Sequence, residues 1–179
     1  IQVSVKNPDE FIRRAAKIIR TGFGQPSVFN SDVIVKELLR QGKSLADARN
    51  GGSSGCVEVG AFGKENYSLT GYFNLPKVLE VTLFNGIDPR TGKQIGLRTG
   101  EASEFDDFDE LYAAFEKQLN HFADIKIRGN LVIERLYAQF MPCPFLSLLT
   151  ADCIANGRDY HDGGARYNTS YIQGVGMGS

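Results

Sequence analysis

The sequence predicts an α/β protein in which helices alternate with short buried strands. Apolar residues recur at helical spacing in several segments, most clearly from Phe11 to Ile19 and from Phe108 to Phe122. Strand-like runs are few and short. Glycine accounts for 20 of 179 residues, and its clusters fall between the periodic segments, where the chain must turn.

Most of the predicted helices have a recognisable start and end. Asn7 and Pro8 open the first helix, which Gly22 ends, while Ser44 and Asn74 are placed to cap later ones. The longest helix starts near Asp106, has an acidic first turn, and is expected to break at Gly129. Its predicted buried stripe is Phe108, Leu111, Phe115, Leu119 and Phe122. The remaining helices are expected at residues 31–41, 45–49, 75–85, 130–140 and 145–155, and the strands at 3–5, 56–59 and 171–175.

Charge and composition exclude several classes of protein. Lys and Arg number 20 against 21 Asp and Glu, and the two signs are interspersed, so there is no basic stripe for nucleic acid. No apolar run is long enough to cross a membrane, and the first residues lack the order of a signal peptide, which predicts a cytoplasmic protein. Three cysteines without a Cys-x-x-Cys pair and two histidines favour neither a disulfide framework nor a metal site.

The glycine-rich stretch at residues 50–60 carries a thiol and a carboxylate two positions apart. In an extended segment Cys56 and Glu58 point to the same side, because the side-chain period of a strand is two. No His or Lys is adjacent to lower the pKa of the thiol, and the neighbouring acid disfavours a thiolate. A neutral thiol beside a carboxylate suits hydrogen-atom transfer at sulfur with proton transfer at oxygen; a plain buried cysteine is the alternative.

The sequence Gly55-Cys56-Val57-Glu58 resembles the thiyl-radical loop of glycyl radical enzymes, in their eliminase and decarboxylase branches. The resemblance extends over nearly the whole chain and keeps the order of the family's segments. The other matching segments are residues 24–30, 69–80, 85–89, 144–147, 152–154 and 163–168.

The resemblance implies a role for each candidate site residue. Cys56 would become a thiyl radical that takes a hydrogen atom from a small-molecule substrate, and Glu58 would be the acid or base that moves the accompanying proton. Pyruvate formate-lyase itself has two adjacent cysteines, whereas Val57 follows Cys56 here, so acyl transfer is disfavoured. Tyr72 matches a tyrosine that lines the substrate pocket in the branch that dehydrates trans-4-hydroxy-L-proline; without the resemblance, Tyr72 would be assigned to the core.

Other reactions within the family stay open. Arylacetate decarboxylases, isethionate sulfite-lyase, choline lyase and the glycerol or propanediol dehydratases share the Cys-x-Glu unit. A different class of hypothesis is an inactive stand-alone product that serves as an interaction module or is a decayed remnant.

The resemblance also implies what lies outside this chain. The family's C-terminal Arg-Val-x-Gly-aromatic loop, which carries the glycyl radical, does not occur in residues 1–179, so the chain is expected to be the central segment of a longer enzyme. The implied fold is part of a ten-stranded α/β barrel of two five-stranded half-barrels. The implied partners are a radical S-adenosylmethionine activase that installs the radical and a second copy of the full-length enzyme, with no bound metal or cofactor.

Three further groups are interpreted as structural. A crowded polar segment could hold a ligand, but capping of the loop is favoured. Cys143, between two prolines, and Cys153, in a predicted helix, are expected to pack in the core. Gly163 and Gly164 are expected to allow close packing, since a phosphate-binding pattern is missing. The polar segment contains Asp152, Asp159, Tyr160, His161 and Asp162.

Overall fold

The structure, a computed structural model, describes residues 1–55 and 57–177, without the side chains of Leu69 and Thr70. The chain forms two compact units. The first unit consists of residues 1–67 and 142–169, and the second of residues 68–141 together with the chain from Ser170 onward.

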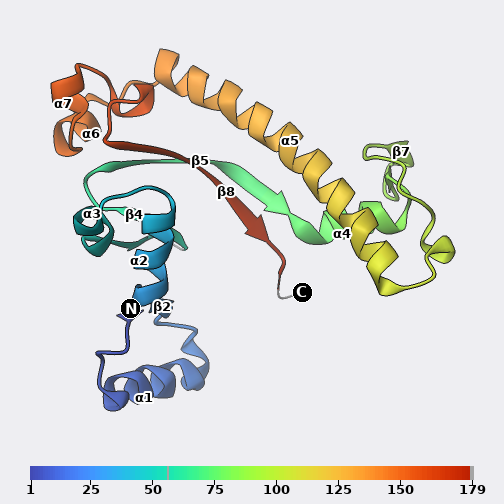
Figure 1. Cartoon of the computed structure of the whole chain (residues 1–179), viewed down its shortest axis with the longest axis horizontal. Coiled ribbons are helices and arrows are strands. Elements are labelled where there is room, and N and C mark those ends of the chain that lie inside the picture. Colours follow the sequence, from blue (N-terminus) through green and yellow to red (C-terminus); the bar gives the residue numbers. More distant parts are fainter. Residues whose placement is uncertain (56, 178–179) are drawn as a thin grey trace. The chain divides into compact units, whose positions relative to one another are not determined.

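The described part of the chain is rich in helix, and its strands pair as two-stranded sheets (Figure 1). The helices are α1 (Asp9–Ile18), α2 (Ser31–Arg40), α3 (Leu45–Arg49), α4 (Leu75–Leu83), α5 (Phe108–Phe140), α6 (Pro144–Leu149) and α7 (Cys153–Asn156). The strands are β1 (Gln2–Val3), β2 (Phe29–Asn30), β3 (Gly51–Ser54), β4 (Glu58–Ala61), β5 (Glu65–Asn74), β6 (Ile87–Asp88), β7 (Lys93–Gln94) and β8 (Tyr167–Val175). Short helical turns are η1 (Ile19–Phe23), η2 (Ala102–Glu104) and η3 (Tyr160–Asp162).

In the first unit, α2 packs on the antiparallel hairpin of β3 and β4. Ile34, Leu38 and Ala48 form its buried core, against which Val59 of β4 packs. The side chain of Ser44 accepts a hydrogen bond from the Asp47 N–H and caps α3, as the sequence predicts. This packing fixes the hairpin against α2 and α3.

Strands β5 and β8 form a two-stranded sheet, and both strands continue from the first unit into the second (Figure 1). The Tyr167 N–H donates to the Lys64 carbonyl near the start of the pair, and Gly174 lies beside Leu75 near its end, so the strands run parallel. The predicted strand at 171–175 is the second half of β8.

Helix α4 begins in the second unit as the sequence predicts, with the side chain of Asn74 accepting a hydrogen bond from the Lys77 N–H. Lys77 Nζ lies 2.6 Å from Asp88 Oδ1. Hydrogen bonds from Lys77, Thr91 and the Arg90 N–H lower the pKa of Asp88 to about 2. The carboxylate therefore ties α4 to the turn that follows it.

Helix α5 is continuous, so the predicted break at Gly129 is wrong (Figure 1). A single glycine inside a helix costs about 1 kcal/mol relative to alanine, which a long helix with good helix formers on both sides can bear. The helix begins where Asp107 accepts a hydrogen bond from the Glu110 N–H.

The buried face of α5 also differs from the predicted stripe. Phe108 is 72% exposed, and the four other predicted residues are half-buried. Gln118 is fully buried instead, because its amide accepts from the Leu97 N–H and donates to the Leu97 carbonyl, at 2.9 and 2.5 Å. A polar side chain with paired backbone partners thus takes a place that the apolar pattern assigns to leucine or phenylalanine.

Two other local predictions are wrong. Residues 145–155 form α6 and α7 rather than one helix, because Asp152 has a φ of 77°, which ends helical geometry. Asn7 does not cap α1; its side chain accepts from the Ser4 N–H at 2.7 Å. Within the described residues no helix has the length and apolar character needed to span a membrane.

Candidate functional site

The predicted catalytic loop is the connection of the β3–β4 hairpin. Ser54 pairs with Glu58 and Gly51 with Ala61, so residues 55–57 join the two strands. Cys56 lies outside the described residues. The predicted arrangement of Cys56 and Glu58 on one side of the backbone therefore stays a prediction.

The carboxylate of Glu58 folds back toward Val57 and Gly55. Its Oε2 accepts a hydrogen bond from the Val57 N–H at 3.1 Å. Gly55 has a φ of 67°, and a Cβ atom at this position would lie 2.6 Å from Glu58 Oε2. Glycine is required at position 55 on both grounds, since its backbone is left-handed and the carboxylate occupies the space of a side chain.

Three glycines let the backbone of the hairpin approach other atoms more closely than a side chain would allow. A Cβ at Gly51 would lie 2.4 Å from the Gly60 carbonyl oxygen, and one at Gly52 would lie 1.9 Å from Gln2 Nε2. A Cβ at Gly60 would lie 2.5 Å from Glu65 Oε2. Because these positions are glycines, the base of the hairpin has almost no side chains of its own. Contacts with neighbouring elements must therefore keep it in place.

A buried ion pair lies at the base of the hairpin. Lys43 Nζ is 3.0 Å from Glu65 Oε1, and the side chains are 2% and 0% exposed. Glu65 Oε2 accepts from the Ala61 N–H at 2.8 Å. Charged groups this deep are uncommon, and neither residue was predicted to have a role.

A second charged cluster surrounds Asp47 of α3. Its carboxylate accepts from Lys64 Nζ and, at 2.8 Å, from the Tyr167 hydroxyl. These hydrogen bonds hold the pKa of Asp47 well below its usual range. Arg166 lies 3.4 Å from Asp47 and 2.8 Å from Asp152, which raises the pKa of its guanidinium. The cluster joins α3 to the start of β8.

A hollow of about 590 Å³ lies beside the hairpin, within the first unit. The hydroxyl oxygen of Ser53, one of its lining residues, is buried and has no hydrogen-bond partner within the described part of the chain. Ser53 was not predicted as a site residue, although its place three residues before Cys56 was a possible signal. The hollow is lined by Ile1, Gln2, Gln25, Pro26, Ser27, Phe29, Ser53 and Gly55.

Tyr72 lies on β5 in the second unit and is 65% exposed, so it does not pack in the core of this segment, and its predicted place in a substrate pocket stays a prediction. It lines a largely apolar hollow of about 280 Å³ together with residues of α4 and α5 that include Lys77 and Lys126. Glu58 belongs to the first unit. Tyr72 and Glu58 therefore belong to different units of the chain.

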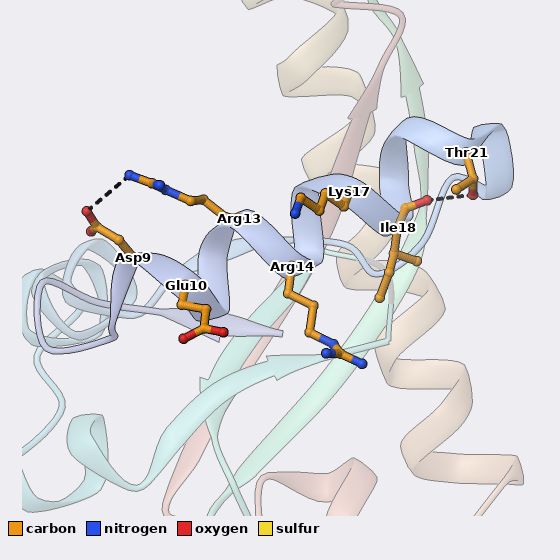
Figure 2. Close-up of a pocket in the computed structure, with 7 residues that line it drawn as sticks. All are labelled: Asp9, Glu10, Arg13, Arg14, Lys17, Ile18 and Thr21. Atoms are coloured by element: carbon orange, nitrogen blue, oxygen red, sulfur yellow. Dashed lines mark hydrogen bonds and ion pairs between the residues drawn. The ribbon is translucent and has the colours of Figure 1, made fainter.

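A hollow of about 780 Å³ runs along α1 (Figure 2). Figure 2 shows Arg13 directed toward Asp9 and the Thr21 hydroxyl directed toward the Ile18 carbonyl. Arg13 and Asp9 form an ion pair at 4.0 Å, and the Thr21 hydroxyl donates a hydrogen bond to the Ile18 carbonyl. The charged side chains here belong to one exposed helix and do not converge on a common point. We do not assign a site to this surface.

The polar segment near residue 160 caps a turn, as the sequence predicts. The carboxylate of Asp159 accepts hydrogen bonds from the Cys143 N–H, the Ser147 hydroxyl and the His161 N–H, at 2.8–2.9 Å. The described residues contain no group of three or more His, Cys, Asp or Glu side chains placed to hold a metal ion.

Cys143, Cys153 and Gly164 have the predicted packing roles. Cys153 is buried, which raises the pKa of its thiol, and Cys143 packs against the same cluster. A Cβ at Gly164 would lie 2.1 Å from the Arg158 carbonyl oxygen, so this glycine allows a close backbone approach.

These features together define a glycine-rich hairpin that presents a Gly-Cys-x-Glu turn. The chain belongs to the pyruvate formate lyase-like family, whose model matches residues 1–179. It is 56% identical over 179 residues to the trans-4-hydroxy-L-proline dehydratase of Clostridioides difficile, an alignment that covers 100% of this chain and 23% of that protein. It is 32% identical over 178 residues to the (2S)-3-sulfopropanediol dehydratase of Klebsiella oxytoca, covering 99% of this chain and 22% of that protein.

Solved structures give the same result. The crystal structure of the C. difficile hydroxyproline dehydratase with bound trans-4-hydroxy-L-proline matches with a TM-score of 0.90, over 99% of this chain and 22% of that one. A glycyl radical enzyme from Archaeoglobus fulgidus matches with a TM-score of 0.82 and 32% identity, over 98% and 22%. The predicted fold class and family resemblance are confirmed, and the chain spans less than a quarter of these relatives.

Proposed function

We propose that this chain is the central segment of a glycyl radical lyase that dehydrates trans-4-hydroxy-L-proline to pyrroline-5-carboxylate. The observation that carries the proposal is the 56% identity, along the whole chain, to an enzyme of that name. The 0.90 TM-score to the substrate-bound hydroxyproline dehydratase supports the same branch. The segment contributes the hairpin with Cys56 and Glu58, and the glycine that carries the radical lies outside it.

Cys56 is the hydrogen-atom shuttle in this proposal. The glycine radical takes the hydrogen atom of the Cys56 thiol, which leaves a thiyl radical on Cys56. Cys56 then takes a hydrogen atom from the substrate carbon beside the ring nitrogen and returns it after the hydroxyl has left. One hydrogen atom leaves the substrate and one comes back, so Cys56 ends each cycle unchanged.

Glu58 moves the proton. It supplies the proton with which the 4-hydroxyl leaves as water, and it recovers a proton when the product becomes the neutral imine. The net reaction is the loss of one water molecule. The hydrogen bond of the Glu58 carboxylate to the Val57 N–H and its closeness to Gly55 support this role, because they hold the acid next to the residues that flank position 56 in the sequence.

Tyr72 is proposed to line the substrate pocket of the complete enzyme. Its exposure in this segment leaves the phenol free to contact a ligand. The full-length enzyme is further proposed to act as a cytoplasmic homodimer and to receive its radical from a radical S-adenosylmethionine activase. The segment itself requires no bound metal or cofactor in this scheme.

A decarboxylase is the second candidate, because the chain is also 31% identical over 175 residues to the indoleacetate decarboxylase of Tractidigestivibacter scatoligenes. A substrate comparison separates the two. The full-length enzyme, activated without oxygen and with its glycyl radical counted by electron paramagnetic resonance, is offered trans-4-hydroxy-L-proline, indoleacetate, 4-hydroxyphenylacetate or isethionate. We expect pyrroline-5-carboxylate from the first and no product from the others. Turnover of another substrate alone, or none despite a full radical signal, would contradict the proposal.

A further inference from the structure

The register of the β3–β4 hairpin is weakly specified by its own strands. Strand β3 reads Gly-Gly-Ser-Ser, and Gly60 lies in β4, so few side chains can lock the pairing. In such strands a slip of one residue turns every side chain to the opposite face. A slip in β4 would move the Glu58 carboxylate away from the turn over which it now lies.

Glu65, which lies outside the hairpin, fixes the register that the two strands specify only weakly. Its Oε2 accepts the Ala61 N–H at 2.8 Å, at the end of the strand that Glu58 begins. The same oxygen lies so close to Gly60 that a Cβ there would be 2.5 Å away. A shift of β4 along its axis would break this hydrogen bond and bring a side chain into the space that only glycine leaves free.

The other oxygen of Glu65 is held just as tightly. Oε1 lies 3.0 Å from Lys43 Nζ and accepts from the Thr169 hydroxyl at 2.5 Å. The Lys43 N–H in turn donates to the Leu38 carbonyl, which ties the lysine to the end of α2. The carboxylate therefore has a fixed position relative to α2 and β8, and β4 is attached to it.

A buried ion pair contributes little net stability, since the cost of removing two charges from water offsets their attraction. Such pairs are best attested as devices that fix one register among several. We propose that Glu65, held by Lys43, is a positioning residue that sets the register of the hairpin and so directs the Glu58 carboxylate to the cysteine turn. This inference rests on the proposed function of Cys56 and Glu58.

The test replaces Glu65 with Gln in the full-length enzyme. The amide keeps the shape of the side chain and an oxygen for the Ala61 N–H, but it leaves Lys43 without its charged partner. A displacement of about 1 Å at a reacting group lowers a rate by about a hundredfold, so we expect kcat per glycyl radical to fall by about tenfold to a hundredfold. Counting radicals removes the effect of enzyme that is misfolded or not activated.

Asp88→Asn is the matched control. Asp88 also accepts from a lysine, a threonine hydroxyl and a backbone N–H, but it lies in the second unit, in the strand after α4. We expect Asp88→Asn to lower the thermal midpoint, as Glu65→Gln does, and to keep kcat per radical within about twofold of the wild type.

An isotope effect separates positioning from stability. With substrate deuterated at the carbon that loses its hydrogen, we expect the isotope effect on kcat to fall in Glu65→Gln, because the departure of the hydroxyl, which Glu58 assists, becomes slower and masks the hydrogen transfer. It should not change in Asp88→Asn. A wild-type kcat per radical and isotope effect in Glu65→Gln would overturn the inference.

Thr169→Val provides a milder variant in case Glu65→Gln does not fold. It removes one donor to Glu65 Oε1 and leaves the ion pair, so we expect a smaller change in the same direction. An unchanged isotope effect in this variant would equally overturn the inference. If Glu58→Gln is inactive while Glu65→Gln is normal, only the positioning role is wrong; an active Cys56→Ser enzyme would instead refute the proposed function.

Discussion

Replacing Glu58 with Gln in the full-length enzyme is expected to lower kcat per glycyl radical by about 10² to 10⁴, the usual contribution of a positioned acid or base. Glutamine has nearly the same shape and can accept the Val57 N–H as the carboxylate does. It cannot give up or recover a proton. The hairpin should therefore keep its structure, while the leaving hydroxyl no longer receives a proton from residue 58.

The measurement combines spin counting of the glycyl radical with an assay for pyrroline-5-carboxylate. The radical yield should match the wild type, because activation does not involve Glu58. Glu58→Asp is the control, since it keeps the acid but shortens its reach, and we expect it to retain more activity than Glu58→Gln. A Glu58→Gln enzyme with wild-type turnover per radical would show that the carboxylate carries no proton in the reaction.

Replacing Gly55 with Ala is expected to impair the same step by a different route. The new Cβ would lie 2.6 Å from Glu58 Oε2, and the carboxylate, as the flexible partner, would have to leave the turn. The left-handed backbone at a φ of 67° adds a strain of about 1–2 kcal/mol. We expect kcat per radical to fall by at least about tenfold, since a displacement of this size moves the acid from its place.

Gly63→Ala separates strain from displacement. Gly63 has a φ of 66°, almost the value at Gly55, but the nearest atom to its Cβ would be the Leu149 carbonyl oxygen at 4.0 Å. Both variants should lose similar thermal stability, and only Gly55→Ala should lose turnover per radical. Equal turnover in the two variants would show that contact between Gly55 and the Glu58 carboxylate has no part in catalysis.

Local features of the fold could be predicted where local chemistry decides them. Ser44 and Asn74 cap α3 and α4 because a hydroxyl or amide before a helix has backbone N–H groups within reach. The predicted helix break at Gly129 was wrong because the free-energy cost of one glycine is small compared with the stability of a long helix. Asp152 could not be predicted, since a left-handed residue between two helical turns leaves no apolar pattern.

Long-range pairing explains what the sequence did not reveal. Strand β5 was missed because its partner, β8, lies about a hundred residues further along the chain, and half of its own residues are polar. Lys43 and Glu65 were missed for the same reason. In the sequence both look like ordinary solvent-exposed charges, whereas in the fold both are buried. Cys56 and Glu58 were predicted from their spacing and the family resemblance, and their roles stay predictions, while Ser53 and its hollow required the folded hairpin.

The exchange of Cys56 for Ser in the full-length enzyme tests the account most directly. A hydroxyl cannot replace the thiol as a hydrogen-atom shuttle, but it leaves the activase free to install the radical on glycine. We predict a glycyl radical signal of normal intensity and no detectable formation of pyrroline-5-carboxylate. Product formation by Cys56→Ser at a rate near that of the wild type would contradict the account.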